Sequence, residues 1–129
     1  SVITTFTASE SITTTGNVRI GDDLFVTGDI TGNISDERLK KKVGQIESAL
    51  EKVTKLSGFI YEYNETAEEL GLKNNGPRVG LSAQEVQKVL PEAVKESPLN
   101  KEYLTVQYEK VVPLLVEAIK EIKIKLDSL

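Results

Sequence analysis

The chain has 129 residues, of which 39% are hydrophobic and 28% charged, and its formal net charge is -4 at pH 7. It contains no cysteine and no histidine, which excludes disulfides, thiolate nucleophiles, Cys-ligated zinc and every catalytic site built on histidine. The charge is -3 over residues 1–34 and -1 over residues 35–129, so neither part predicts a basic surface for nucleic acid, and no apolar run approaches the roughly 18 residues of a membrane span.

Residues 17–34 have the pattern of short β-strands joined by tight turns. Apolar residues alternate with polar ones, and glycines interrupt the pattern every few positions: Val18, Ile20, Leu24, Val26 and Ile30. One chain offers too few strands to close a core. We therefore expect the partners to be other copies of the chain, wound into an intertwined trimeric β-prism or β-helix, with residues 1–34 forming the C-terminal end of a fibre stalk. The alternative is an ordinary hairpin in a larger monomer.

At Ser35 the apolar period changes from two to that of a helix. Residues 36–56 place apolar side chains three and four positions apart, which predicts an amphipathic helix ended by Gly58. Residues 58–64, GFIYEYN, then alternate aromatic and other side chains as a half-buried strand does. Residues 71–78 are rich in turn formers and predict an exposed loop.

The following segments are short. The sequence predicts a strand through Val79 and Leu81, a helix from Gln84 to Leu90 ended by Pro91, and a strand from Tyr103 to Val106. From about Gln107 the chain is predicted to be helical to its end, and Pro113 either kinks this helix or lies in its first turn. Residues 35–129 thus predict a small α+β domain with a long C-terminal helix.

The last helix carries a heptad seam of apolar residues spaced alternately four and three apart: Tyr108, Val112, Leu115, Ile119, Ile122, Leu126 and Leu129. The seam spans about three heptads, the lower limit for a coiled coil. It predicts either parallel packing in a homotrimer or a helix packed on its own domain, and the predicted stalk favours the trimer.

The boundary itself reads SDERLK, residues 35–40. One interpretation is structural: Ser35 or Asp36 caps a helix, and the basic residues at 40–42 are solvated. The other is catalytic, with Ser35 as nucleophile and Lys40 as general base.

A resemblance favours the second interpretation. SDERLK, the strand GFIYEYN, the segment GLSAQEVQKVLPEAV at 80–94 and YLTVQYEKVVPLLVEAIKEI at 103–122 occur in this order. Together they resemble the intramolecular chaperone of endosialidase tail spikes, a peptidase family also found in other phage appendages and in myelin regulatory factor. The resemblance implies a domain, residues 35–129, that helps three fibre chains to wind together and then cleaves itself off with a Ser35–Lys40 dyad.

Cleavage is expected between Ile34 and Ser35, or between Ser35 and Asp36 if residues of another chain act. Lys40 must be neutral to act as a base, which burial against a neighbouring chain would favour, so we expect cleavage to depend on assembly. Gln84 and Glu85 are candidates to line the dyad, with a structural turn as the alternative. We expect no cofactor and no metal.

Two further functions stay open. One is a non-cleaving structural trimerisation domain at a fibre tip, and the other is the self-cleaving module of a membrane-released transcription factor. We expect the partners to be the chain itself, as a homotrimer, and upstream fibre or spike domains of the same protein. No nucleic acid or membrane is expected, and the expected location is the virion, after assembly in the host cytoplasm.

Overall fold

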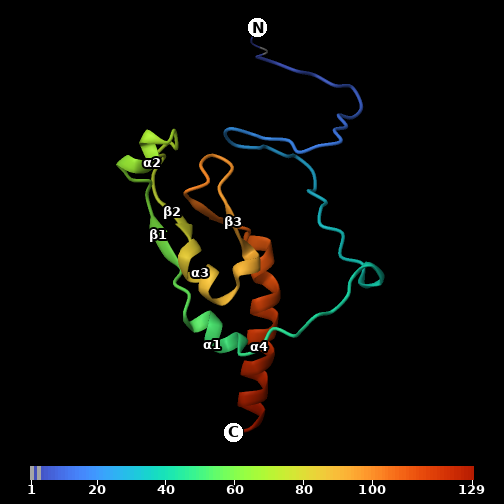
Figure 1. Ribbon diagram of the computed structural model, residues 1–129, viewed down its shortest axis with the longest axis vertical. Coiled ribbons are helices and arrows are strands. Elements are labelled where there is room, and N and C mark those ends of the chain that lie inside the picture. Colours follow the sequence, from blue (N-terminus) through green and yellow to red (C-terminus); the bar gives the residue numbers. More distant parts are fainter. Residues whose placement is uncertain (1, 3) are drawn as a thin grey trace. The chain divides into compact units, whose positions relative to one another are not determined.

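Figure 1 shows a computed structural model of the chain, which describes residue 2 and residues 4–129. The chain forms two compact units, Ser1–Lys41 and Lys42–Leu129. The predicted division at Ser35, between a stalk and a chaperone domain, stays a prediction. Among the described residues, no helix combines the length and the apolarity that a bilayer crossing requires.

The described residues of the first unit contain one short element, the 3-10 turn η1 (Glu37–Leu39). The described residues 4–34 form neither helix nor strand. The apolar residues of the predicted strands are exposed, from 46% for Val26 to 79% for Ile30. The predicted strands are therefore not formed within one chain, which lacks the neighbours that would pair with them. The trimeric stalk over residues 1–34, of which residues 1 and 3 lie outside the described residues, stays a prediction.

The predicted continuous helix over residues 36–56 is wrong. Only η1 and α1 (Ala49–Thr54) are helical in that range, and residues 40–47 between them are not. Gly44 and the β-branched Val43 have low helix propensity, and Val43 is 93% exposed. Ser48 then adopts the left-handed conformation at φ 51°, which separates α1 from the chain before it.

The second unit is built on α1 and the C-terminal helix α4 (Val112–Asp127), which pack against each other. The turn η3 (Tyr108–Val111) leads directly into α4, and Pro113 lies in the first turn of that helix. Proline is tolerated there because the amide it lacks would have no partner within the helix. The core consists of small and aliphatic residues: Ala49, Val86, Val89, Leu90, Ala93, Val111, Leu114 and Ala118.

Two antiparallel ribbons complete the second unit. Strand β1 (Phe59–Tyr61) pairs with β2 (Arg78–Gly80), so that Ile60 lies opposite Val79. Strand β3 (Val94–Glu96) pairs with β4 (Leu104–Val106), so that Lys95 lies opposite Thr105. The predicted strands at 58–64 and at 103–106 are thus present in shorter form, and the strand predicted at 79–81 is present one residue earlier. Strand β3 was not predicted.

Three short helical elements connect these strands. The helix α2 (Glu65–Glu69), which was not predicted, begins where the Asn64 side chain accepts a hydrogen bond from the Ala67 amide. The predicted helix at 84–90 is present as α3 (Ala83–Val89), which Ser82 caps, and the turn η2 (Pro91–Ala93) follows it. The unit is small and α+β, with a long C-terminal helix, as the sequence predicts.

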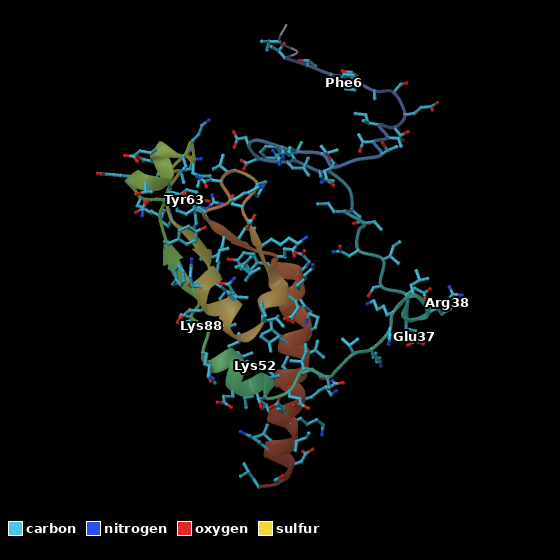
Figure 2. The ribbon with its side chains drawn as sticks, in the orientation of Figure 1. Phe6, Glu37, Arg38, Lys52, Tyr63 and Lys88 are labelled. Atoms are coloured by element: carbon cyan, nitrogen blue, oxygen red, sulfur yellow. The ribbon has the colours of Figure 1, made fainter. Side chains whose placement is uncertain are left out.

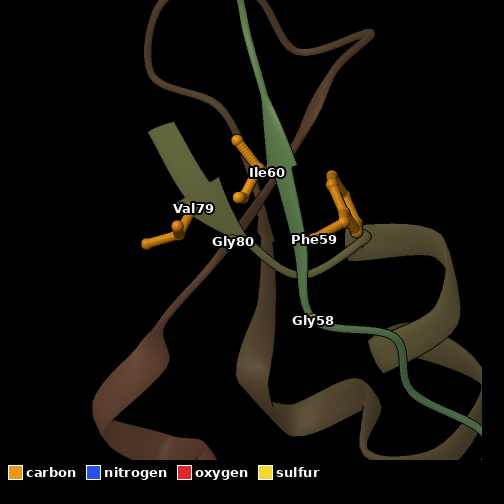
Figure 3. A pocket seen from close by; sticks show the side chains of 5 residues that line it. All are labelled: Gly58, Phe59, Ile60, Val79 and Gly80. Carbon is orange, nitrogen blue, oxygen red and sulfur yellow. The ribbon is translucent and has the colours of Figure 1, made fainter. Parts of the chain in front are cut away.

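Figure 3 shows the β1–β2 ribbon from close by, with a shallow hollow lined by Gly58, Phe59, Ile60, Val79 and Gly80. The side chains of Ile60 and Val79 lie on the face opposite to Phe59 and are 75% and 78% exposed. On the other face, the rings of Phe59 and Tyr61 meet edge to face, as do those of Tyr61 and Tyr63. The predicted alternation of this strand is confirmed.

Candidate functional site

The turn η1 brings two of the predicted site residues into contact. The Lys40 ammonium, at Nζ, donates a hydrogen bond of 2.5 Å to the Ser35 hydroxyl oxygen. Ser35 precedes the turn and Lys40 ends it, five positions later. Both side chains are exposed. The Ser35 hydroxyl and the Lys40 side chain thus lie within hydrogen-bond reach of each other in the first unit.

Local hydrogen bonds explain why the chain turns here. The Leu39 amide donates to the Asp36 carbonyl at 3.0 Å, and the Lys40 amide donates to the Glu37 carbonyl at 3.2 Å. Asp36 and Lys40 themselves have extended backbones. The chain therefore enters and leaves a single 3-10 turn in extended form, which returns the Lys40 side chain to Ser35.

Asp36 caps this turn, and Arg38 binds the same carboxylate. Asp36 Oδ1 accepts hydrogen bonds from the Arg38 amide at 2.9 Å and from its Nε at 3.0 Å, while Oδ2 accepts from Nη2 at 2.8 Å. The Arg38 side chain, and then its backbone amide, hold the pKa of the Asp36 carboxyl below its usual value, and the Asp36 carboxylate in turn raises the pKa of Arg38. Figure 2 labels Glu37 and Arg38 on this turn.

The residue on the N-terminal side of Ser35 is exposed. The Ile34 side chain is 82% exposed. Asn33, directly before it, has a left-handed backbone at φ 53°, a conformation that asparagine adopts more readily than other residues with a side chain. A residue with a left-handed backbone thus lies immediately before the predicted cleavage site, a feature that the sequence did not predict.

Gln84 and Glu85 lie in the first turn of α3, in the second unit. In that unit, the Glu85 carboxylate accepts a hydrogen bond from the Ser57 amide at 3.2 Å, and the Glu85 amide donates to the Ser82 hydroxyl at 3.3 Å. Ser82 also contacts Gln84 through its hydroxyl. These contacts give both residues a role in ordering the start of α3, and their proposed place beside the dyad stays a prediction.

The predicted seam lies on an exposed stripe of α4. Within the single chain its residues are exposed by 41% to 65%: Leu115, Ile119, Ile122 and Leu126. A different stripe, Val111, Leu114 and Ala118, is buried. The helix therefore packs on its own unit through one stripe and leaves the heptad seam uncovered.

Sequence analysis missed two residues that order this structure. Arg38 binds the Asp36 carboxylate, and Glu121 on α4 caps the start of α1. The spacing of Asp36 and Arg38 within SDERLK was available as a signal, whereas the contact between Glu121 and Ala49 joins residues 72 positions apart.

Residues 35–95 match a peptidase family model described as chaperone of endosialidase. The chain is 42% identical over 97 residues to Long tail fiber protein Gp37 of Enterobacteria phage K3, an alignment that covers 74% of this chain and 8% of that relative. It is 38% identical over 96 residues to Myelin regulatory factor homolog 1 of Caenorhabditis elegans, covering 71% of this chain and 10% of the relative.

A further relative, Long tail fiber protein Gp37 of Enterobacteria phage M1, is 33% identical over 97 residues, which are 74% of this chain and 38% of that protein. The chain therefore spans less than half the length of each of these relatives. The match to the family model begins at Ser35.

Proposed function

The chain belongs, through residues 35–95, to the family of endosialidase chaperones, and on this basis we propose that it is an intramolecular chaperone of a phage tail fibre that releases itself by self-cleavage at Ser35. It would drive three fibre chains to wind together and would then be cut off as a domain of residues 35–129. The tail-fibre relatives support the fibre context. The proposed location is the virion, after assembly in the host cytoplasm.

One observation carries the proposal of self-cleavage: the contact of 2.5 Å between Lys40 Nζ and Ser35 Oγ. It supports the proposed catalytic pair because a nucleophile and its base must lie within hydrogen-bond reach. The two residues lie on either side of the single turn η1, and the family match begins at the first of them, Ser35.

The proposed reaction starts from a neutral Lys40 amine. The amine takes the Ser35 hydroxyl proton while Oγ attacks the carbonyl carbon of Ile34. The Ile34–Ser35 C–N bond then breaks, and the Ser35 nitrogen receives the proton from Lys40. This leaves an ester between the Ile34 carbonyl and Ser35 Oγ. Water hydrolyses the ester, so that Ile34 ends in a carboxylate and Ser35 becomes a new N-terminus.

The need for a neutral amine links cleavage to assembly. A lysine amine ordinarily loses its proton near pH 10.4, about three units above neutrality, and Lys40 is exposed in the single chain. Burial by a neighbouring chain would favour the neutral form. The uncovered seam on α4 supports a homotrimer, since exposed apolar heptads are the surface on which coiled coils form. We therefore propose that the trimer completes the site.

The experiment is the mass of the purified 129-residue chain after incubation. Self-cleavage predicts a C-terminal fragment beginning at Ser35 or Asp36, and no fragment from Ser35→Ala or Lys40→Ala. Lys40→Arg should also stay whole because a guanidinium does not lose its proton in a protein. The matched controls are Ser11→Ala and Lys101→Ala, which should cut as the wild type does. An intact wild-type chain that is trimeric would instead favour the non-cleaving trimerisation domain.

A further inference from the structure

The turn that carries the proposed dyad also carries an ion pair that the proposed reaction does not use. We propose that Arg38 is a positioning residue for self-cleavage, which holds the Asp36 carboxylate away from the Lys40 amine and thereby favours the neutral form of that amine. The inference rests on the proposed function, in which Arg38 is neither the nucleophile nor the base.

Asp36 and Arg38 form a bidentate ion pair. Both carboxylate oxygens of Asp36 are occupied: Oδ1 accepts from the Arg38 amide and from Nε, and Oδ2 accepts from Nη2 at 2.8 Å and from Nε at 3.2 Å. The planar guanidinium fork matches the carboxylate in this way, which the single ammonium of a lysine does not. The carboxylate thus faces Arg38, although it lies in sequence between Ser35 and Lys40.

The charge of Asp36 explains why this orientation matters. The hydrogen bonds from Arg38 lower the pKa of the Asp36 carboxyl, so the group is negative at any pH at which a lysine acts as a base. A carboxylate within about 4–6 Å of an ammonium favours the charged form. An Asp36 that turned toward Lys40 would therefore oppose the loss of the proton that the reaction requires.

The other charged residues of the segment do not replace Arg38. Lys41 and Lys42 follow Lys40 in the sequence, and Glu37 is a second carboxylate in the turn. Within the described part of the chain, the charged side chains of this turn make two contacts, the Asp36–Arg38 ion pair and the Lys40–Ser35 hydrogen bond. The pair is exposed, by 85% for the Arg38 side chain and 40% for Asp36, and exposed pairs contribute little to stability. Its effect is therefore expected in the chemistry rather than in folding.

The test is the pH profile of cleavage in the full chain at low salt, for four proteins: wild type, Arg38→Gln, Asp36→Asn and the double variant. Arg38→Gln should raise the pH of half-maximal rate by about one unit and slow cleavage about tenfold at pH 7, because Asp36 is then free to face Lys40. The double variant should return to the wild-type midpoint, since it has no carboxylate at position 36. Arg38→Lys should keep the midpoint nearer to wild type because it keeps the charge.

If the Asp36–Arg38 ion pair had a purely structural role, Arg38→Gln and Asp36→Asn would slow cleavage equally. The pH of half-maximal rate would then be unchanged. That result would overturn the proposal. A second measurement separates it from the proposed function: carbon NMR of ¹³C-labelled lysine in the uncut Ser35→Ala background. There Arg38→Gln should raise the titration midpoint of the Lys40 amine, and Asp36→Asn in the same chain should reverse the rise. If Arg38→Gln leaves the titration midpoint of the Lys40 amine unchanged, the role of Arg38 is overturned, whether or not the chain cuts itself. If the midpoint rises as expected but the wild-type chain never cuts, only self-cleavage is rejected.

Discussion

The carboxylate of Glu121 caps a helix that begins 72 residues earlier. Glu121 Oε2 accepts a hydrogen bond of 2.6 Å from the Ala49 amide and one of 3.3 Å from the Leu50 amide, at the start of α1. Ser48, in the usual capping position, makes no such bond with its side chain. A carboxylate at this place satisfies free amides and opposes the positive end of the helix dipole. Glu121 therefore fixes α1 to α4 by a polar contact beside the apolar core.

Replacing Glu121 with alanine should destabilise the second unit by about 1–2 kcal/mol, the range for loss of a helix cap whose amides become unsatisfied. Glu121→Gln keeps an acceptor oxygen and should cost less than Glu121→Ala. Urea unfolding followed by circular dichroism gives both values. Glu109→Ala, which removes an exposed carboxylate of η3, is the matched control and should leave stability nearly unchanged. Equal losses for Glu121→Ala and Glu109→Ala would contradict the capping role.

Gly80 and Tyr108 show a close approach that only glycine permits. A Cβ at position 80 would lie 2.7 Å from the Tyr108 hydroxyl oxygen and 3.2 Å from Tyr61 Cε1. The same hydroxyl accepts a hydrogen bond of 3.0 Å from the Leu81 amide. Tyr108 thus packs on the end of β2 because position 80 has no side chain.

Gly80→Ala should therefore destabilise the unit by about 1–3 kcal/mol through overpacking, and Tyr108→Phe by about 1 kcal/mol through loss of the acceptor. The double variant should lose less than the sum of these values because the phenylalanine ring lacks the oxygen that the new Cβ would meet. Thermal unfolding of all four chains completes the cycle. Strict additivity would show that the two residues do not interact.

The sequence predicts the parts of this fold that depend on local signals. The helix α3 has a serine cap and a proline two residues after its last residue, and α4 has Pro113 in its first turn. The failed prediction over residues 36–56 has the opposite cause: its apolar spacing is real, since Ile46, Leu50 and Val53 pack on the core. The break at Ser48 depends on α4, which supplies the cap, and a contact over 72 residues leaves no local pattern.

The candidate site divides in the same way. Ser35 and Lys40 are five residues apart, and their contact follows from one local turn. The predicted strands of residues 17–34 and the seam on α4 are readable as patterns, but the described residues of the single chain do not cover either of them. Spacing identifies such surfaces because burial imposes a period, and it does not identify what covers them.

Two neighbouring leucines of α4 offer a direct test of the two stripes. Leu114 is fully buried, whereas Leu115 is 42% exposed in the single chain. Leu114→Ala should cost about 2–5 kcal/mol in the free energy of unfolding, the range for a cavity in a core. Leu115→Ala should cost far less within one chain and should instead weaken association, measured by analytical ultracentrifugation. The reverse pattern would mean that the buried stripe is the one that associates.

The last prediction concerns the link between assembly and cleavage. Ile119→Asp or Ile122→Asp would bury an unpaired carboxylate at symmetric positions of the proposed trimer, and the desolvation of such a charge is costly. Both variants should lose the trimer. Because we propose that assembly favours the neutral Lys40 amine, both should also cut more slowly, although each lies some 80 residues along the chain from Ser35.

Ile124→Asp is the matched control for this prediction. Ile124 lies two residues from Ile122, about 200° around the helix, and is 65% exposed, the same as Ile119. A carboxylate there stays in solvent, so Ile124→Asp should remain trimeric and should cut at the wild-type rate. Light scattering gives the oligomeric state, and denaturing electrophoresis of the same samples gives the extent of cleavage. An Ile119→Asp chain that is monomeric yet cuts as fast as Ile124→Asp would show that cleavage does not depend on trimer formation. The dyad would then be complete within a single chain.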